Sequence, residues 1–125
     1  MMVMTVRTAA QIAQAGETAR RASMRAYKSA LFKSLAMFPA PNHPHLLAAI
    51  MEAVEGIRAA NPFDPFVMTM DTVAIYERDH PDMAAFADMV GLTEETIDAI
   101  FTVAMAIDRR ESEADVLALF AALTE

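Results

Sequence analysis

Apolar residues recur along this chain at intervals of three, four and seven positions, and no segment alternates apolar and polar residues as a half-buried strand would. In the first segment Met24, Tyr27, Leu31 and Leu35 fall on one stripe, which predicts a long amphipathic helix over residues 8–37. Similar stripes predict helices over about residues 45–60, 65–78 and 94–108, with shorter ones after Pro81 and after Ser112. The pattern therefore predicts an all-α fold, a compact bundle of five or six helices that begins with a long N-terminal helix.

Prolines and capping residues separate these stripes. All six prolines lie between residues 39 and 81, where the helical spacing is interrupted. Asp64 followed by Pro65 predicts a helix start, and Gly91 predicts a helix end in a left-handed conformation. Thr93 and Ser112 stand where they can cap the last two helices. With 125 residues, 55% of them hydrophobic, the chain is expected to form one domain, residues 1–125.

Charge divides this domain into two parts. The first forty residues carry six basic side chains and one acid, a net charge of +5, whereas the rest carries −12, which gives the total of −7. The domain is thus interpreted as a basic amphipathic helix, residues 8–37, followed by an acidic helical body, residues 45–124. Such a division indicates that one end contacts something that the other end would repel.

Composition argues against most enzyme classes. The chain has no cysteine and three glycines, and it contains no nucleophile elbow, phosphate loop or dinucleotide fingerprint. His43, His45 and His80 lack the spacing of a metal site, so we expect them to be buried or to cap helices. The eleven methionines are interpreted as flexible core filler, and no cofactor is expected. The absence of cysteine and of a membrane-spanning apolar run favours a cytoplasmic protein, and the absence of the catalytic motifs favours a non-enzymatic one.

One tight helical corner has a recognisable pattern. A small residue is followed by a glycine at the turn, by a capping threonine and by two inward isoleucines: Ala87, Gly91, Thr93, Ile97 and Ile100. Residues 82–101 thereby resemble the helix-turn-helix of the repressor-type DNA-binding superfamily. The resemblance implies that the start of the second helix would enter the major groove. Here that segment carries Glu94, Glu95 and Asp98, whose charge would repel phosphate, so groove reading by this helix is disfavoured.

The basic segment leaves several alternatives open. Its cations can form a solvated face whose charge is neutralised by the acidic body or by the acidic half of a second copy. They can instead bind a nucleic-acid backbone, or lie on an anionic membrane. The membrane alternative is least favoured because the segment is rich in alanine and poor in bulky anchors. We expect a docking arm in which apolar anchors are flanked by cations, formed by Arg21, Met24, Arg25, Tyr27, Lys28, Leu31 and Leu35.

These observations favour a small acidic helical protein–protein interaction module that self-associates or binds another protein. The alternatives are a nucleic-acid-binding regulator with a helix-turn-helix scaffold, and an acidic decoy that occupies the basic groove of a nucleic-acid-binding partner.

Overall fold

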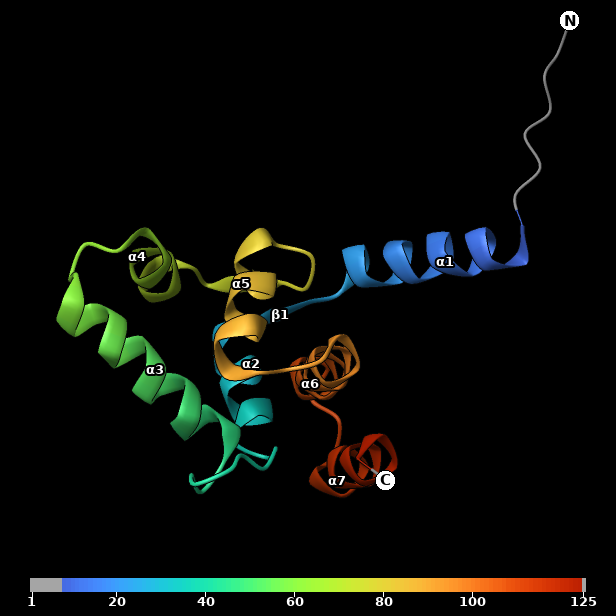
Figure 1. Ribbon diagram of the computed structural model, residues 1–125. Coiled ribbons are helices and arrows are strands. Elements are labelled where there is room, and N and C mark those ends of the chain that lie inside the picture. Colours follow the sequence, from blue (N-terminus) through green and yellow to red (C-terminus); the bar gives the residue numbers. More distant parts are fainter. Residues whose placement is uncertain (1–7, 125) are drawn as a thin grey trace, which may run out of the picture.

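The computed structural model describes residues 8–124, apart from the side chain of Phe86, and is predominantly helical (Figure 1). This part of the chain is all-α in class, as the apolar pattern predicts, with one very small sheet. In chain order its elements are α1 (Ala9–Ser23), β1 (Arg25–Tyr27), α2 (Lys28–Leu35), α3 (Leu46–Ala60), α4 (Pro65–Thr72), β2 (Ile75–Glu77), α5 (Pro81–Val90), α6 (Glu94–Asp108) and α7 (Glu113–Leu123).

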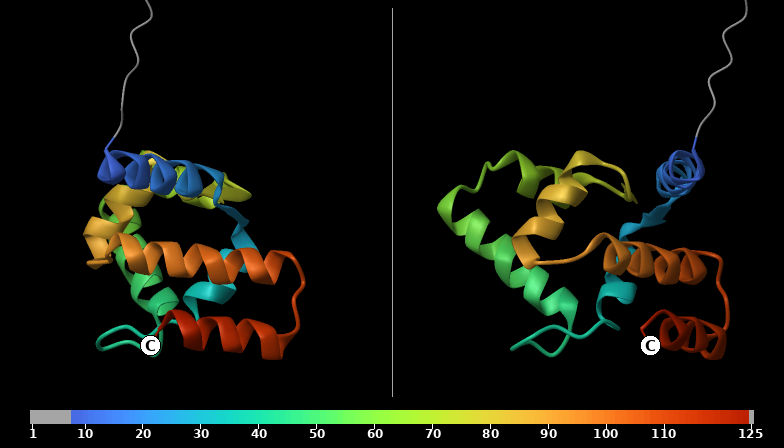
Figure 2. Two further views of the ribbon diagram at one scale, coloured as in Figure 1. Left: turned by 90° about the vertical axis from the view of Figure 1, so that its right-hand side faces the viewer. Right: turned by 45° about the vertical axis from the view of Figure 1, so that its right-hand side comes forward.

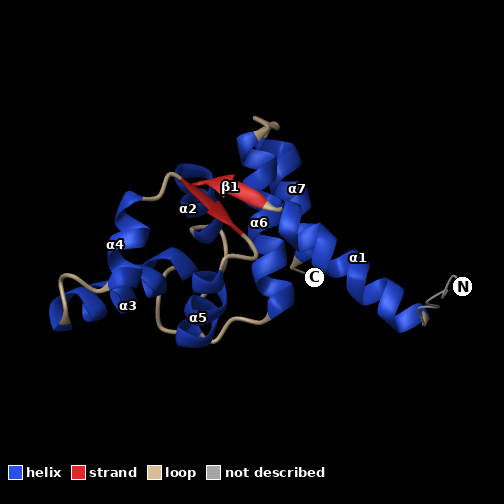
Figure 3. Ribbon diagram, turned by 90° about the horizontal axis from the view of Figure 1, so that it is seen from above, coloured by secondary structure: helices blue, strands red, loops and turns tan. Residues whose placement is uncertain are grey.

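The single helix predicted over residues 8–37 is wrong. The helical conformation stops at Met24, whose backbone is extended (φ −79°, ψ 122°), and β1 follows before α2 begins. β1 pairs antiparallel with β2, and the backbone N–H of Arg78 donates to the carbonyl of Met24 at 2.9 Å (Figure 3). The extended segment buries both Met24 and Ala26 in the core while the side chains between and after them stay outside. A continuous helix could not bury this pair and also provide the backbone groups that bond to β2.

The same sheet shortens the helix predicted over residues 65–78. This helix begins as expected, with the Asp64 side chain accepting from the amides of Phe66 and Val67 and with Pro65 at its first position. It ends at Thr72, because Ile75–Glu77 form β2. The end of α5 is also as predicted, with Gly91 left-handed at φ 72°.

The core is organised around α6, which lies between α1 and α7 in Figure 2. α6 packs against α2, β1 and α7. Ser34 of α2 is fully buried and donates its hydroxyl to the carbonyl of Ile100 at 2.7 Å, which satisfies a polar group inside the apolar contact. Most of the α6 surface is covered, and its buried residues are Ile97, Asp98, Ala99, Ile100, Phe101, Val103, Ala104 and Ala106.

Candidate functional site

Three of the predicted interaction residues lie inside the protein. Met24, Leu31 and Leu35 are each 5% exposed and belong to the core. Tyr27 is 58% exposed, and Arg25 lies beside it at the surface of β1. The seven residues therefore do not form one docking face, because the turn from helix to strand after Ser23 interrupts the spacing on which that expectation rested.

The basic members of that set also have different surroundings. Lys28 donates its ammonium to the carbonyl of Met70 at 2.9 Å and lies 5.7 Å from the centre of the Phe32 ring. Arg21 is held by an acidic residue of α6, as described next. The Arg25 side chain makes no hydrogen bond or ion pair with any other residue in the range 8–124. Of these three cations, only Arg25 is left for contact with another molecule.

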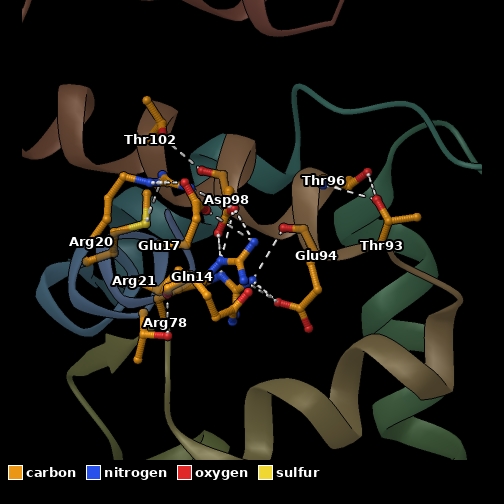
Figure 4. A network of polar contacts seen from close by, with 12 residues as sticks. Gln14, Glu17, Arg20, Arg21, Arg78, Thr93, Glu94, Thr96, Asp98 and Thr102 are labelled. Atoms are coloured by element: carbon orange, nitrogen blue, oxygen red, sulfur yellow. Dashed lines mark hydrogen bonds and ion pairs between the residues drawn. The ribbon is translucent and has the colours of Figure 1, made fainter. Parts of the chain in front are cut away.

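An arginine–carboxylate cluster joins α1 to α6 (Figure 4). Asp98 is only 8% exposed and accepts from three arginines. Arg20 Nη2 and Arg21 Nη2 each lie 3.0 Å from Asp98 Oδ2, and Arg78 Nε lies 2.9 Å from Asp98 Oδ1. Three cations thus meet three anions in the complete cluster, which consists of Glu17, Arg20, Arg21, Arg78, Glu94 and Asp98.

The electrostatics of the cluster keep Asp98 ionised. Burial acts to raise the pKa of Asp98, but the hydrogen bonds from Arg21, Arg20 and Arg78 outweigh it, so this pKa lies below its ordinary value. The Arg78 side chain is 6% exposed and depends on this carboxylate and on Glu94 for its neutralisation. The cluster is thus a buried ionic contact around Arg78 with a more exposed rim at Arg20.

Sequence reasoning did not identify Arg20 or Arg78 as important residues. Arg20 could have been noticed as the i+3 partner of Glu17 on one helix face. Arg78 is the single cation in a strongly acidic stretch, between Glu77 and Asp79, which is a weak signal for an internal ion pair.

α1 contributes no residue to the core. None of its residues is buried, and Ile12 is 60% exposed. Figure 1 shows it running outward from the rest of the fold. Its last turn faces α6 through Arg20 and Arg21, whereas a stripe of apolar residues follows the other side at i, i+3, i+7 and i+10. We call this stripe the outer face of α1, and its members are Ile12, Ala15, Ala19 and Ala22.

The corner between α5 and α6 contains the local features that its sequence predicts. The amide of Leu92 donates to the carbonyl of Ala87 at 2.9 Å, and the Thr93 hydroxyl accepts from the Thr96 amide at 3.2 Å. Ala87, Ile97 and Ile100 are buried. Asp98 lies on the second helix of this corner and is covered by arginines, so the side of α6 that bears it is already in contact with α1.

A cavity of about 300 Å³ lies among α2, α4, β2, α5 and α6. Its walls are largely apolar, with Phe32, Met70 and Phe101 among the larger side chains. Tyr76 also lines it, and its hydroxyl donates to the carbonyl of Met70 at 2.9 Å. The polar residues of the wall include Thr69, Glu77, His80 and Asp82.

Two of the histidines cap helices, as expected. His45 accepts from the amide of Ala48 at the start of α3, and His80 accepts from the amide of Asp82 at the start of α5. His43 bonds to Glu52 and to the carbonyl of Pro41. Over residues 8–124 no group of three or more histidine, aspartate or glutamate side chains is arranged to hold a metal ion.

None of the helices in the described part of the chain has the length and apolar character needed to cross a bilayer. Comparisons with models of protein families, with curated proteins and with solved structures gave no significant match.

Proposed function

We propose that this protein is a non-enzymatic protein–protein interaction module that self-associates through the outer face of α1. The observation that carries the proposal is that α1 has fifteen residues and buries none of them within its own chain. An isolated helix of this length is only marginally stable in water. A helix that is nevertheless capped and apolar on one side gains stability when that side is covered by another protein surface.

The start of α1 is specified by its own residues. Thr8 and Gln11 form a reciprocal capping box, with the Gln11 amide 3.1 Å from the Thr8 hydroxyl and the Thr8 amide 2.8 Å from the Gln11 side chain. Its end is held at α6 by Arg20 and Arg21. α1 is therefore fixed at one end by ion pairs, and its outer face is left for a partner.

A second copy of the chain is the partner that best fits this face. The outer face consists of alanines around one isoleucine, which allows two helices to approach closely when they cross. Two copies of one helix related by a twofold axis present the same apolar surface to each other. Because α1 is only about 22 Å long at 1.5 Å per residue, the interface is smaller than a standard one, and we expect a dissociation constant in the micromolar range or weaker.

The proposal is tested by sedimentation velocity over a range of concentrations, with two variants that add the same charge. Ile12→Glu places a carboxylate on the outer face, whereas Ala10→Glu places one on the opposite side of α1. We expect the native chain and Ala10→Glu to show the same concentration-dependent dimer and Ile12→Glu to remain monomeric. A native chain that stays monomeric up to millimolar concentration would falsify the proposal, as would equal dimerisation of the two variants.

The nucleic-acid alternative has less support. Arg20 and Arg21 are already bonded to Asp98, so contact with phosphate would require them to leave a buried carboxylate. The first turn of α6, which would enter a groove in a helix-turn-helix protein, carries Glu94 and Glu95. No contact of the described residues specifically favours the acidic-decoy alternative over self-association.

A further inference from the structure

The buried part of the cavity wall is apolar. Its aliphatic and aromatic residues come from α2, α3 and α6 and are Leu31, Leu35, Ile50, Ile97, Ile100 and Phe101. Met70 of α4 and Tyr76 of β2 are buried there as well. Among the described lining residues that are buried, Tyr76 is therefore the one that brings a side-chain oxygen or nitrogen to the cavity.

That hydroxyl is already bonded within the protein. Tyr76 donates it to the carbonyl of Met70 at 2.9 Å. Over the described residues, no buried side-chain nitrogen or oxygen lacks a hydrogen-bond partner. A polar group of a ligand that entered this part of the cavity would give up its bonds to water and find no unsatisfied side chain to replace them. The wall therefore favours an occupant without charge and without hydrogen-bonding groups.

The charged residues of the wall do not change this conclusion. Side chains alternate along β2, so Tyr76 is buried and Glu77 is exposed. Glu77 is paired directly with Arg25 in the register of the sheet, so a cation lies next to it on the exposed face. The Asp82 carboxylate is partly exposed and lies 3.8 Å from Nδ1 of His80. Neither acid supplies a reason for an ion in the apolar part of the cavity.

The volume sets the size of an occupant. A protein cavity of about 150 Å³ lined by Leu, Ile and Phe takes up benzene, a molecule of six heavy atoms. The cavity of about 300 Å³ should accordingly accommodate about twelve heavy atoms, the size of two fused aromatic rings with a small substituent. Aromatic and thioether side chains suit such a body, and Phe32, Phe66 and Met83 add to those already named.

We propose that this cavity binds an uncharged, hydrocarbon-like small molecule of about twelve heavy atoms, such as a two-ring aromatic compound. The ligand gains free energy by leaving water for a wall of apolar side chains, and it leaves no polar group unpaired. None of the described lining residues belongs to α1. The proposal therefore does not rest on self-association through the outer face of α1.

Four probes test the size and the charge of the ligand: 1-methylnaphthalene, 1-naphthylmethylamine, 1-naphthoate and benzene. The chain contains no tryptophan, so naphthalene fluorescence can be followed with the protein in excess, which keeps the hydrocarbon below its solubility limit. We expect 1-methylnaphthalene to bind with a dissociation constant of order 0.1 mM. The amine and the carboxylate should each bind about fivefold more weakly or worse, because the charge must lose its hydration or keep the rings partly outside. Benzene, measured by competition, should bind about tenfold more weakly because it makes fewer contacts.

Methionine methyl groups show where the probe binds. Met70 and Met83 line the cavity, whereas Met51 of α3 and Met105 of α6 do not. In a spectrum of the full chain labelled with methyl-¹³C methionine, the ring current of bound 1-methylnaphthalene should shift the signals of Met70 and Met83. The signals of Met51 and Met105 should stay in place.

A matched pair of substitutions provides a second localisation. Val73 and Val90 are both half-buried, but only Val73 lines the cavity. Val73→Phe fills part of the space and should weaken 1-methylnaphthalene about fivefold or more, whereas Val90→Phe should leave its affinity unchanged. If Val73→Phe does not fold, the methionine signals still decide where the probe binds.

The results that overturn the proposal are distinct. No binding of 1-methylnaphthalene at protein concentrations up to about 1 mM overturns the cavity as a ligand site. An ion that binds as tightly as 1-methylnaphthalene overturns the uncharged class. Shifts at Met51 and Met105 as large as those at Met70 and Met83 overturn the location. Ile12→Glu, which tests self-association, should bind the probe with native affinity, so a failure of either proposal is recognised separately.

Discussion

Asp98→Asn should destabilise the protein strongly, although it replaces only one carboxylate oxygen by an amide nitrogen. Asp98 neutralises Arg78, which is 6% exposed and cannot reach bulk water. Removing one member of a buried ion pair costs about 3–5 kcal/mol, because the other charge stays buried. Here Arg78 keeps Glu94, both through its carboxylate and through its carbonyl at 3.3 Å, and asparagine still offers an acceptor. We therefore expect the lower figure of about 2–3 kcal/mol.

The other two arginines add little to this value. The Arg20 side chain is 46% exposed and also bonds to Glu17, so its contact with Asp98 is screened by water and is worth at most about 0.5 kcal/mol. The exposure of the Arg21 side chain lies between those of Arg78 and Arg20, so its contact with Asp98 is of intermediate strength. For a chain of this length 1 kcal/mol corresponds to about 4 °C in Tm. Asp98→Asn should therefore lower Tm by about 8–12 °C, whereas Arg20→Gln should lower it by about 2 °C or less.

The assay is thermal and urea unfolding followed by circular dichroism, with Asp88→Asn as the control. Asp88 is an exposed acid of α5 whose side chain makes no hydrogen bond or ion pair within the described part of the chain, so its replacement removes the same charge without a buried partner. A Tm for Asp98→Asn within 2 °C of the control would refute the reasoning. An equal fall of Tm for Arg20→Gln would also refute it, because the energies of these ion pairs would then not depend on how exposed the arginine is.

Acid provides an independent check on the same carboxylate. The pKa of Asp98 is lowered in the folded state, so the stability that this group contributes is fully present above its unfolded pKa, near 3.8. That contribution is lost as the pH falls from this value through the lower folded pKa. The difference in stability between the native chain and Asp98→Asn should therefore be constant near neutral pH and shrink below about pH 4. A difference that stays constant down to pH 2 would contradict the lowered pKa.

Two further predictions concern single residues. Burial, together with the negative charge of Asp71, raises the pKa of Tyr76 to about 12, so its stabilising contribution should persist below pH 10 and be lost as the pH approaches 12. In an absorbance titration at 295 nm, Tyr76→Phe should remove this late step, and a late step that remains would contradict the assignment. Gly91→Ala should cost about 1 kcal/mol of stability, because the backbone at residue 91 is left-handed with φ 72°. Gly56→Ala should stabilise the protein by about 0.5–1 kcal/mol, because residue 56 lies inside α3 with open space around it. Urea unfolding that shows the same sign of change for both variants would count against the backbone argument.

The parts of the fold that the sequence predicted correctly are those that local chemistry decides. Asp64 followed by Pro65 starts a helix because a carboxylate can accept from the first amides and proline fits the first turn. Gly91 ends one because only glycine adopts the left-handed conformation without strain. Thr93 and Ser112 cap the next two helices for the same reason as Asp64. Each of these features involves neighbours within four positions, so one segment contains all the information.

The sheet could not be predicted in this way. Met24, Leu31 and Leu35 are buried as an apolar stripe would require, but Met24 reaches the core from an extended backbone. Two strands of three residues are too short to show an alternating pattern. The pairing of Tyr27 with Ile75 joins segments far apart in the sequence, and no local sequence preference predicts it.

The division of charge was visible in the sequence, but its specific contacts were not. Arg20 and Arg21 of the basic segment bond to Asp98 of the acidic body, so part of the complementarity between the two ends is used within one chain. What α1 still offers to a partner is its uncharged outer face. Self-association through that face should then depend little on salt, because it rests on apolar burial. Nucleic-acid binding by the same helix would weaken steeply as salt is added, so the salt dependence of any association distinguishes these two functions.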